Sequence, residues 1–150
     1  MDYEIVFKEK LTPDDLAVLD DGINRHTEDR FGKVPRGSLA FFMQDADGRV
    51  VAGVTGYWNA FGWLYVNSLW VDEEARGSGL GAHLMRLIED ESARRGCKHS
   101  YLNTMSFQAP AFYEKLGYVE FGRLDDFPPG HSRIFLTKDL PNAIKPTGGE

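Results

Sequence analysis

The residues best suited to chemistry form a glycine-rich loop, Arg76–Gly81, between a long apolar segment and a segment of helical period. Glycines allow the backbone to turn sharply and to come close to a ligand. The first amides of the helix that follows have no partner inside that helix, and its dipole favours negative charge there. Because Arg76 adds a fixed positive charge that suits phosphate, the loop predicts a pyrophosphate site rather than a plain surface turn.

Two other kinds of phosphate-binding loop compete with this interpretation. A P-loop ends in Lys followed by Ser or Thr, which this loop lacks. The dinucleotide pattern G-x-G-x-x-G/A does match residues 77–82. That fingerprint, however, needs an acidic residue at the end of the next strand, and His99–Thr104 contains no Asp or Glu. NAD binding is therefore the weaker prediction.

The elements that must position the loop follow from the period of the apolar residues. Thr12 and Pro13 suit the cap and first position of an early helix, and Asp47-Gly48 is a strong hairpin signal between two strands. Later helices are predicted at 79–95 and 109–116. Strands are predicted at 3–8, 38–44, 50–58, 63–71, 99–104, 118–123 and 133–138.

This order predicts an α/β fold of the mixed α+β kind, with a mostly antiparallel seven-stranded central sheet and flanking helices. The fourth and fifth strands should run parallel, because a helix crosses over between them. We expect one domain over residues 1–140, since a chain of 150 residues fits one domain better than two. We expect a disordered tail over residues 141–150.

Composition restricts the class of protein. The formal net charge of -6 argues against general binding to nucleic acid or to a membrane surface. The N-terminus has neither a basic nor an apolar targeting region, and no apolar run approaches the length of a spanning helix. The single cysteine, Cys97, cannot form an intramolecular disulfide, and we expect it to be packed rather than nucleophilic. We therefore expect a cytoplasmic protein.

Two sequence blocks resemble the GNAT superfamily of N-acetyltransferases. After the strand ending Leu69-Trp70-Val71, the residues Arg76, Gly79 and Gly81 fit the family signature R/Q-x-x-G-x-G/A. Residues 106–118, Ser-Phe-Gln-Ala-Pro-Ala-Phe-Tyr-Glu-Lys-Leu-Gly-Tyr, resemble the second family block, N-x-x-A-x-x-L-Y-x-x-x-G-F. The predicted element order fits the fold of this family from residue 3 to 140. The resemblance implies that the fourth and fifth strands splay apart.

The resemblance also implies acetyl-CoA as the co-substrate and no metal. Its pyrophosphate would sit on the loop amides, and its pantetheine arm would run along the strand that ends at Val71. A backbone amide near Leu69 or Trp70 would polarise the thioester carbonyl, and Tyr113 would be the catalytic proton donor to the departing thiolate. The implied cofactor-binding residues are Leu69, Val71, Arg76, Gly77, Ser78, Gly79, Leu80, Gly81, Ser106 and Ala109.

Two positions depart from the family pattern. Ser106 stands where the family often has Asn, and Asn67 stands on the strand where many members place a catalytic Glu or Asp. Asn cannot accept a proton at neutral pH, so a water relay or another group must take the proton of the attacking amine. Glu28, Asp29, Glu73 and His131 are open candidates, and none is favoured.

The predicted function is acetyl transfer from acetyl-CoA to a primary amine by direct attack in a ternary complex. The alternative is a non-catalytic acyl-CoA sensor or interaction module, which the two departures favour and Tyr113 disfavours. The resemblance places the acceptor between residues 25–35 and 125–131, where Tyr57, Trp58, Phe61, Trp63 and Tyr65 could line a pocket. A small amine, an antibiotic, a polyamine and a protein amine all remain open as acceptors, as does a homodimer.

Overall fold

The structure is a computed structural model that describes residues 2–141. The chain divides into two compact units, Met1–Val34 and a second unit from Pro35 onward. Apart from Pro141, the tail predicted to be disordered lies outside the described residues. The prediction of one domain over residues 1–140 stays a prediction.

The first unit contains helix α1, Pro13–Phe31, whose start matches the sequence signals. Thr12 is the N-cap, and its hydroxyl accepts a hydrogen bond from the Asp15 backbone amide at 3.2 Å. The Asp15 carboxylate accepts one in return from the Thr12 amide at 2.9 Å, which completes a capping box. Gly32 ends the helix with a φ of 72°.

The seventh strand is not confirmed, because the structure assigns no strand to residues 3–8. A strand requires a ladder of hydrogen bonds to a neighbour, and β-branched and aromatic side chains do not supply that partner. This segment also has three apolar residues in a row, Ile5, Val6 and Phe7, without the alternation of a half-buried strand. Its composition alone was therefore a weak basis for the prediction.

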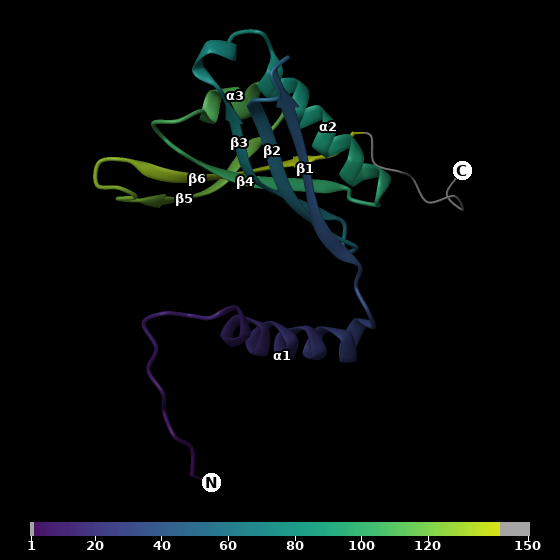
Figure 1. The fold of residues 1–150 in the computed structure, drawn as a ribbon, viewed down its shortest axis with the longest axis vertical. Coiled ribbons are helices and arrows are strands. Elements are labelled where there is room, and N and C mark those ends of the chain that lie inside the picture. The colour runs from purple at the N-terminus through teal and green to yellow at the C-terminus, as the bar shows by residue number, and fades with distance from the viewer. Residues whose placement is uncertain (1, 142–150) are drawn as a thin grey trace. The chain divides into compact units, whose positions relative to one another are not determined.

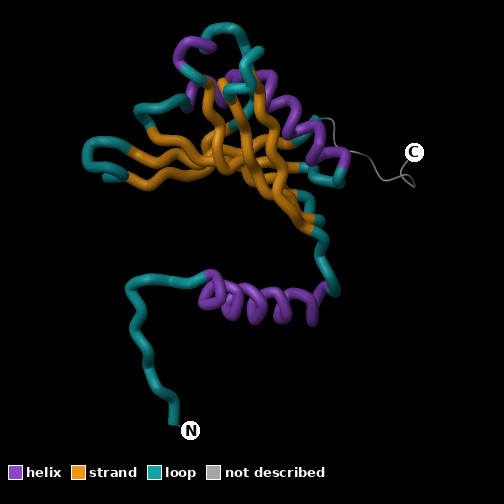
Figure 2. The backbone as a smooth tube through the Cα atoms, in the orientation of Figure 1, coloured by secondary structure: helices purple, strands orange, loops and turns teal. Residues whose placement is uncertain are grey.

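The second unit is built on a mixed sheet that has six strands among the described residues, in the order β1-β2-β3-β4-β6-β5 (Figures 1 and 2). Four of the neighbouring pairs are antiparallel, and β3 with β4 is parallel. The bounds are Arg36–Gln44 for β1, Val50–Asn59 for β2, Trp63–Val71 for β3, His99–Met105 for β4, Val119–Asp125 for β5 and Ser132–Asp139 for β6. The fold class is therefore confirmed as mixed α/β.

The parallel pair is the part of the sheet that matters most for the site. Its ladder covers only the pairs Trp63–His99, Leu64–Ser100 and Tyr65–Tyr101. Both strands continue beyond these pairs, β3 to Val71 and β4 to Met105, without pairing to each other. Backbone groups on the facing edges of the two strands are thus left for another partner.

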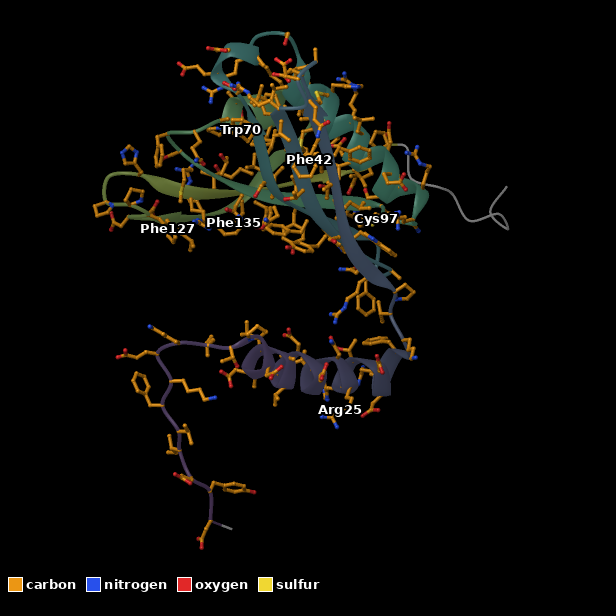
Figure 3. The ribbon with its side chains drawn as sticks, viewed as in Figure 1. Arg25, Phe42, Trp70, Cys97, Phe127 and Phe135 are labelled. Carbon is orange, nitrogen blue, oxygen red and sulfur yellow. The ribbon has the colours of Figure 1, made fainter. Side chains whose placement is uncertain are left out.

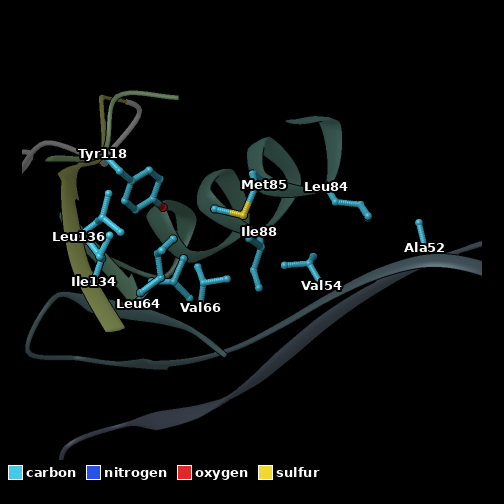
Figure 4. Packing of buried hydrophobic residues seen from close by; sticks show 11 residues of the cluster. Ala52, Val54, Leu64, Val66, Leu84, Met85, Ile88, Tyr118, Ile134 and Leu136 are labelled. Carbon is cyan, nitrogen blue, oxygen red and sulfur yellow. The ribbon is translucent and has the colours of Figure 1, made fainter. Parts of the chain in front are cut away.

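Helix α2, Leu80–Arg94, packs on one face of the sheet and forms the core with it (Figure 4). Leu84, Met85 and Ile88 are buried on the helix against apolar residues of β2 and β3 such as Val54 and Leu64. The helix predicted at 79–95 is therefore confirmed. We call the opposite side of the sheet, which faces away from α2, the distal face.

Two shorter helices complete the described second unit. A 3-10 turn, Glu73–Ala75, follows β3, and helix α3, Pro110–Lys115, follows β4. Among residues 2–141, none of the helices combines the length and apolar character needed to cross a bilayer.

A buried polar cluster ties α2 to the far strands, and the sequence did not predict it. Glu89 on α2 is only 7% exposed. Its carboxylate accepts hydrogen bonds from the Tyr118 hydroxyl at 2.9 Å and from the Lys138 ammonium at 2.8 Å. The Ser100 hydroxyl lies 2.9 Å from that of Tyr118. Burial and the adjacent Glu89 carboxylate raise the pKa of Tyr118, which keeps its phenol neutral.

Candidate active site

A cavity of about 860 Å³ lies where the β3–β4 ladder has ended. It is lined by residues from the end of β3, the glycine-rich loop, the start of α2, the end of β4 and helix α3 with the turn before it. Every predicted site residue except Ser78 and Ser106 belongs to its lining. The full lining consists of Leu69, Trp70, Val71, Ala75, Arg76, Gly77, Gly79, Leu80, Gly81, Ala82, Thr104, Phe107, Gln108, Ala109, Phe112 and Tyr113.

Two loop glycines are required by backbone conformation. Gly77 and Gly79 have φ angles of 85° and 79°, which L side chains rarely adopt. A Cβ atom at either position would meet no atom within 4 Å, so the space beside them is open. Gly79 is also the N-cap of α2 and has no side chain to cap it. The first amides of the helix are therefore left to a ligand or to solvent.

Gly81 is required for a different reason, which is close packing. A Cβ atom there would come within 3.2 Å of the Phe112 ring and 3.7 Å of Val71. The start of α2 therefore approaches α3 and the end of β3 closely, and this approach draws three walls of the cavity together.

Arg76 and Ser78 shape the loop from within. The Arg76 Nε donates a hydrogen bond to the Val71 carbonyl at 3.0 Å, which fixes the guanidinium at the end of β3. The Ser78 hydroxyl donates to the Ala75 carbonyl at 2.9 Å, so this side chain turns to its own backbone. Among the described residues, no carboxylate forms an ion pair with Arg76. Its terminal nitrogens thus keep their donors for a ligand.

Tyr113 lines the cavity from α3 and is held by its aromatic neighbours. Its ring meets that of Phe112 edge-on at 5.0 Å between centroids and that of Tyr118 at 6.1 Å. Burial raises the pKa of the Tyr113 phenol above its ordinary value, so it stays protonated at neutral pH. The hydroxyl makes no hydrogen bond within the described part of the chain, and it can therefore donate one to a ligand.

Ser106 does not reach the cavity lining. Its backbone and hydroxyl instead bind Ser132, which connects the turn after β4 to the start of β6. Its amide donates to the Ser132 carbonyl at 2.8 Å, and its hydroxyl accepts from the Ser132 amide at 2.9 Å. The lining also includes Thr104 and Gln108, which the sequence did not lead us to assign to the site. The Gln108 side-chain oxygen accepts a hydrogen bond from the Met105 amide at 3.0 Å. The position of Gln108, next to Ala109 in the second sequence block, could have drawn attention to it.

Asn67 lies at a β-bulge on the β2–β3 pair. Gly56 pairs with Val66 and Thr55 with Ser68, so Asn67 has no partner in the register. Its side-chain amide donates to the Ser68 hydroxyl at 3.2 Å and is exposed. A bulge changes the direction of a strand next to a site, and here it directly precedes the part of β3 that lines the cavity.

The four candidate proton acceptors lie on different elements. Glu28 and Asp29 belong to α1 in the first unit, and Glu73 belongs to the 3-10 turn. His131 precedes β6, and its ring packs edge-on against Phe107 of the cavity lining at 5.0 Å. None of the four is itself in the lining.

The distal face carries part of the aromatic cluster noted in the sequence. Trp63 and Tyr65 of β3 both contact the ring of Tyr101 on β4, at 5.7 and 4.8 Å between centroids. Asn103 donates a hydrogen bond to the Tyr65 hydroxyl at 3.1 Å.

Cys97 is fully buried, and burial raises the pKa of its thiol, which suits a packed rather than a reactive cysteine.

Comparison with known proteins identifies the family to which this chain is similar. The sequence model of the Acetyltransferase (GNAT) family matches residues 7–118. An acetyltransferase of Agrobacterium fabrum is 36% identical over 109 residues, which are 73% of this chain and 79% of that protein. A blasticidin-S acetyltransferase of Streptomyces morookaense is 40% identical over 96 residues, or 62% of this chain and 68% of that protein.

A solved structure supports the same assignment. The crystal structure of an acetyltransferase from Bacillus cereus superposes with a TM-score of 0.77 at 33% identity, over 90% of this chain and 98% of that one. The family match, these relatives and the shared fold lead to one conclusion: the chain belongs to the GNAT superfamily of N-acetyltransferases and is an acyl-CoA-dependent enzyme of that kind.

Proposed function

We propose that this enzyme transfers the acetyl group of acetyl-CoA to a primary amine by direct attack in a ternary complex. The observation that carries the proposal is the single cavity that brings the uncapped start of α2, the unpaired end of β3 and Tyr113 together. These three parts match the three needs of the reaction, namely a grip on the pyrophosphate, a grip on the thioester arm and a proton source.

The cofactor would extend from the loop into the gap between β3 and β4. Its pyrophosphate would accept hydrogen bonds from the amides of residues 77–81, with the Arg76 guanidinium beside it. The pantetheine amides would pair with backbone groups on the free edge of β3, as an added strand does. The Val71 carbonyl already accepts one hydrogen bond from Arg76, and its second lone pair remains available.

The chemical step needs one carbonyl polariser and one acid. The amine nitrogen attacks the thioester carbon, the C–S bond breaks and an amide forms. A backbone amide near Leu69 or Trp70 would stabilise the oxyanion. The neutral phenol of Tyr113 would protonate the departing thiolate of CoA. The proton of the attacking amine would pass to water, since Asn67 cannot accept it.

We further propose that the acceptor is a small molecule and that the enzyme works in the cytoplasm, where acetyl-CoA is available to it. A relative at 40% identity is named for an antibiotic substrate, blasticidin S, which supports a small-molecule acceptor as a class. Consumption of the thioester with a panel of primary amines tests transfer itself. A protein that binds acetyl-CoA but consumes none with any amine would be the non-catalytic sensor.

Binding of acetyl-CoA should raise the melting temperature of the protein, whereas NADH should not, because a ligand that binds only the folded state stabilises it. Gly79→Asp should abolish this rise, because it places a negative charge beside the pyrophosphate. Gly48→Asp is the matched control, since Gly48 has a similar φ of 81° and equally open space but lies in the β1–β2 turn. An unchanged rise in Gly79→Asp would refute the assignment of the loop.

A further inference from the structure

One cation near the cavity has neither a hydrogen-bond acceptor nor an anionic partner among the described residues of its own unit, 35–141. The side chain of Arg133, at the start of β6, forms no hydrogen bond and no ion pair there, and its Nε is buried and unsatisfied. A buried donor that forms no hydrogen bond lowers the stability of the folded protein, and the cost is larger when the group is charged. A buried unsatisfied group of this kind calls for an explanation, and an absent ligand is one.

The side chain of Arg133 is nevertheless held in place. Its guanidinium carbon lies 4.1 Å from the ring centroid of Phe127, a stacked cation–π arrangement. Figure 3 shows Phe127 at the loop between β5 and β6. Asp125, whose carboxylate accepts a hydrogen bond from the Ser132 hydroxyl at 3.1 Å, forms no ion pair with Arg133. The result is a fixed cation with free donors.

The location of Arg133 relates it to the reaction. It pairs with Met105 at the carboxyl end of β4, one residue beyond Thr104 of the cavity lining. Ile134 and Leu136 are buried in the core under α2, so strand alternation puts Arg133 and Phe135 on the distal face. Arg133 thus lies at the same end of the sheet as the cavity, on the face away from α2.

Under the proposed function, the acceptor must reach the thioester from this side. The cofactor occupies the cavity between α2, α3 and the end of β3, so the attacking amine approaches the gap between β3 and β4 from the distal face. We propose that Arg133 binds an anionic group of the acceptor, a carboxylate or a phosphate-type oxyanion, and so selects amines that carry one. The planar guanidinium suits such a group because it offers two parallel donors.

Arg123 provides an internal comparison. It lies on β5, next to Arg133's strand, but its guanidinium donates to the Glu120 carboxylate at 2.7 and 3.4 Å. Arg123 therefore already has its anion, whereas Arg133 has none. The two arginines form a matched pair for substitution.

The first test observes the Nε–H signal of Arg133 by NMR in protein saturated with CoA, which occupies the pyrophosphate loop. Arg133→Lys identifies the signal by its loss. Addition of CoA to the free protein, up to saturation, should leave the signal in place. Acetate and inorganic phosphate should then shift it saturably, whereas chloride at equal ionic strength should not. A signal that does not move with either oxyanion overturns the proposal, and a shift produced by CoA itself assigns the anion to the cofactor and also overturns it.

The second test measures turnover with a series of ω-amino carboxylates and their matched carboxamides. The enzyme should prefer the carboxylate in kcat/KM by about tenfold or more, the factor expected of a charge-assisted hydrogen bond. Arg133→Gln should remove this preference, while Arg123→Gln should keep it. Equal use of both acceptors by the unmodified enzyme, or an unaltered preference in Arg133→Gln, refutes the role of Arg133.

The two tests separate this inference from the proposed function. If the enzyme consumes no thioester with any amine, acetyl transfer to amines fails, and the NMR result alone decides whether Arg133 is an oxyanion site. If transfer occurs without a preference for anionic acceptors, the proposed function stands and the inference about Arg133 falls.

Discussion

Under the proposed function Tyr113 is the general acid, and its surroundings keep it in the protonated form that this role needs. A phenol has a pKa near 10 in water, and burial in the cavity wall raises the pKa of Tyr113 further. It therefore holds its proton across the range in which an amine becomes a free nucleophile. The CoA thiolate would leave beside this phenol, where a hydrogen-bond donor in a partly buried setting would stabilise it.

Tyr113→Phe should lower kcat at neutral pH by about 10²- to 10⁴-fold, the usual size of general acid catalysis. The thermal shift produced by acetyl-CoA should stay nearly the same, because the hydroxyl acts as the thiolate forms rather than in binding. The measurement is kcat from steady-state kinetics, under conditions in which the chemical step limits the rate. A loss below about threefold would return Tyr113 to a purely structural role in the contact with Phe112 and Tyr118.

At the scale of elements, the sequence predicted the fold well where the determining interactions lie between residues that are close in sequence. The helix cap at Thr12, the Asp47-Gly48 turn and the bounds of β3 are all as expected. The candidate site was predictable for the same reason, since its loop and Tyr113 lie in two short blocks of sequence. The length of the β3–β4 ladder and the bulge at Asn67 depend on how strands meet in space, and no local pattern encodes them.

Glu89 shows what local pattern could not provide. It follows Ile88 at a position that looks solvent-facing on a helix, yet its partners come from residues 29 and 49 positions further along the chain. Only the tertiary arrangement shows that this carboxylate is buried with a phenol and an ammonium around it. The same holds for Arg133, whose missing partner is visible only when every neighbouring strand is in place.

Glu89→Ala should destabilise the protein by about 3–5 kcal/mol, because it leaves the partly buried Lys138 ammonium and the buried Tyr118 hydroxyl without their shared acceptor. Glu91→Ala on the same helix should cost less than about 1 kcal/mol, since Glu91 pairs with Arg94 and Arg95 at an exposed position. Urea unfolding followed by fluorescence measures both. Equal small losses in the two variants would show that the buried cluster adds no more than a surface ion pair.

At the scale of the whole molecule, the enzyme combines a formal net charge of -6 with local positive sites. Arg76, the start of α2 and Arg133 all lie at the end of the sheet where β3 and β4 separate. The negative net charge disfavours polyanions such as nucleic acid, whereas these local positive groups would still attract small anionic ligands. Charge is therefore informative here through its placement rather than through its sum.

The pH dependence of turnover should be set by the deprotonation of the acceptor amine. A base on the enzyme should not set it. Asn67 cannot take a proton, so kcat/KM for an alkyl amine should rise with pH towards the amine pKa, near 10.4 for a lysine-like amine. The raised pKa of Tyr113 keeps the acid in its active, protonated form over this range, and activity should fall only above pH 10. Asn67→Ala should then reduce activity modestly without moving the rising limb.

Two acceptors with different amine pKa values decide between a free-amine limb and an enzyme base. If the free amine limits the rate, the rising limb moves with the acceptor pKa, to lower pH for the less basic amine. If a carboxylate or His131 acts as the base, the limb stays at one pH for both acceptors. A fixed limb would overturn the assignment to the amine, and the variants Glu73→Gln and His131→Asn would then show which side chain titrates, because only the true base loses its limb on substitution.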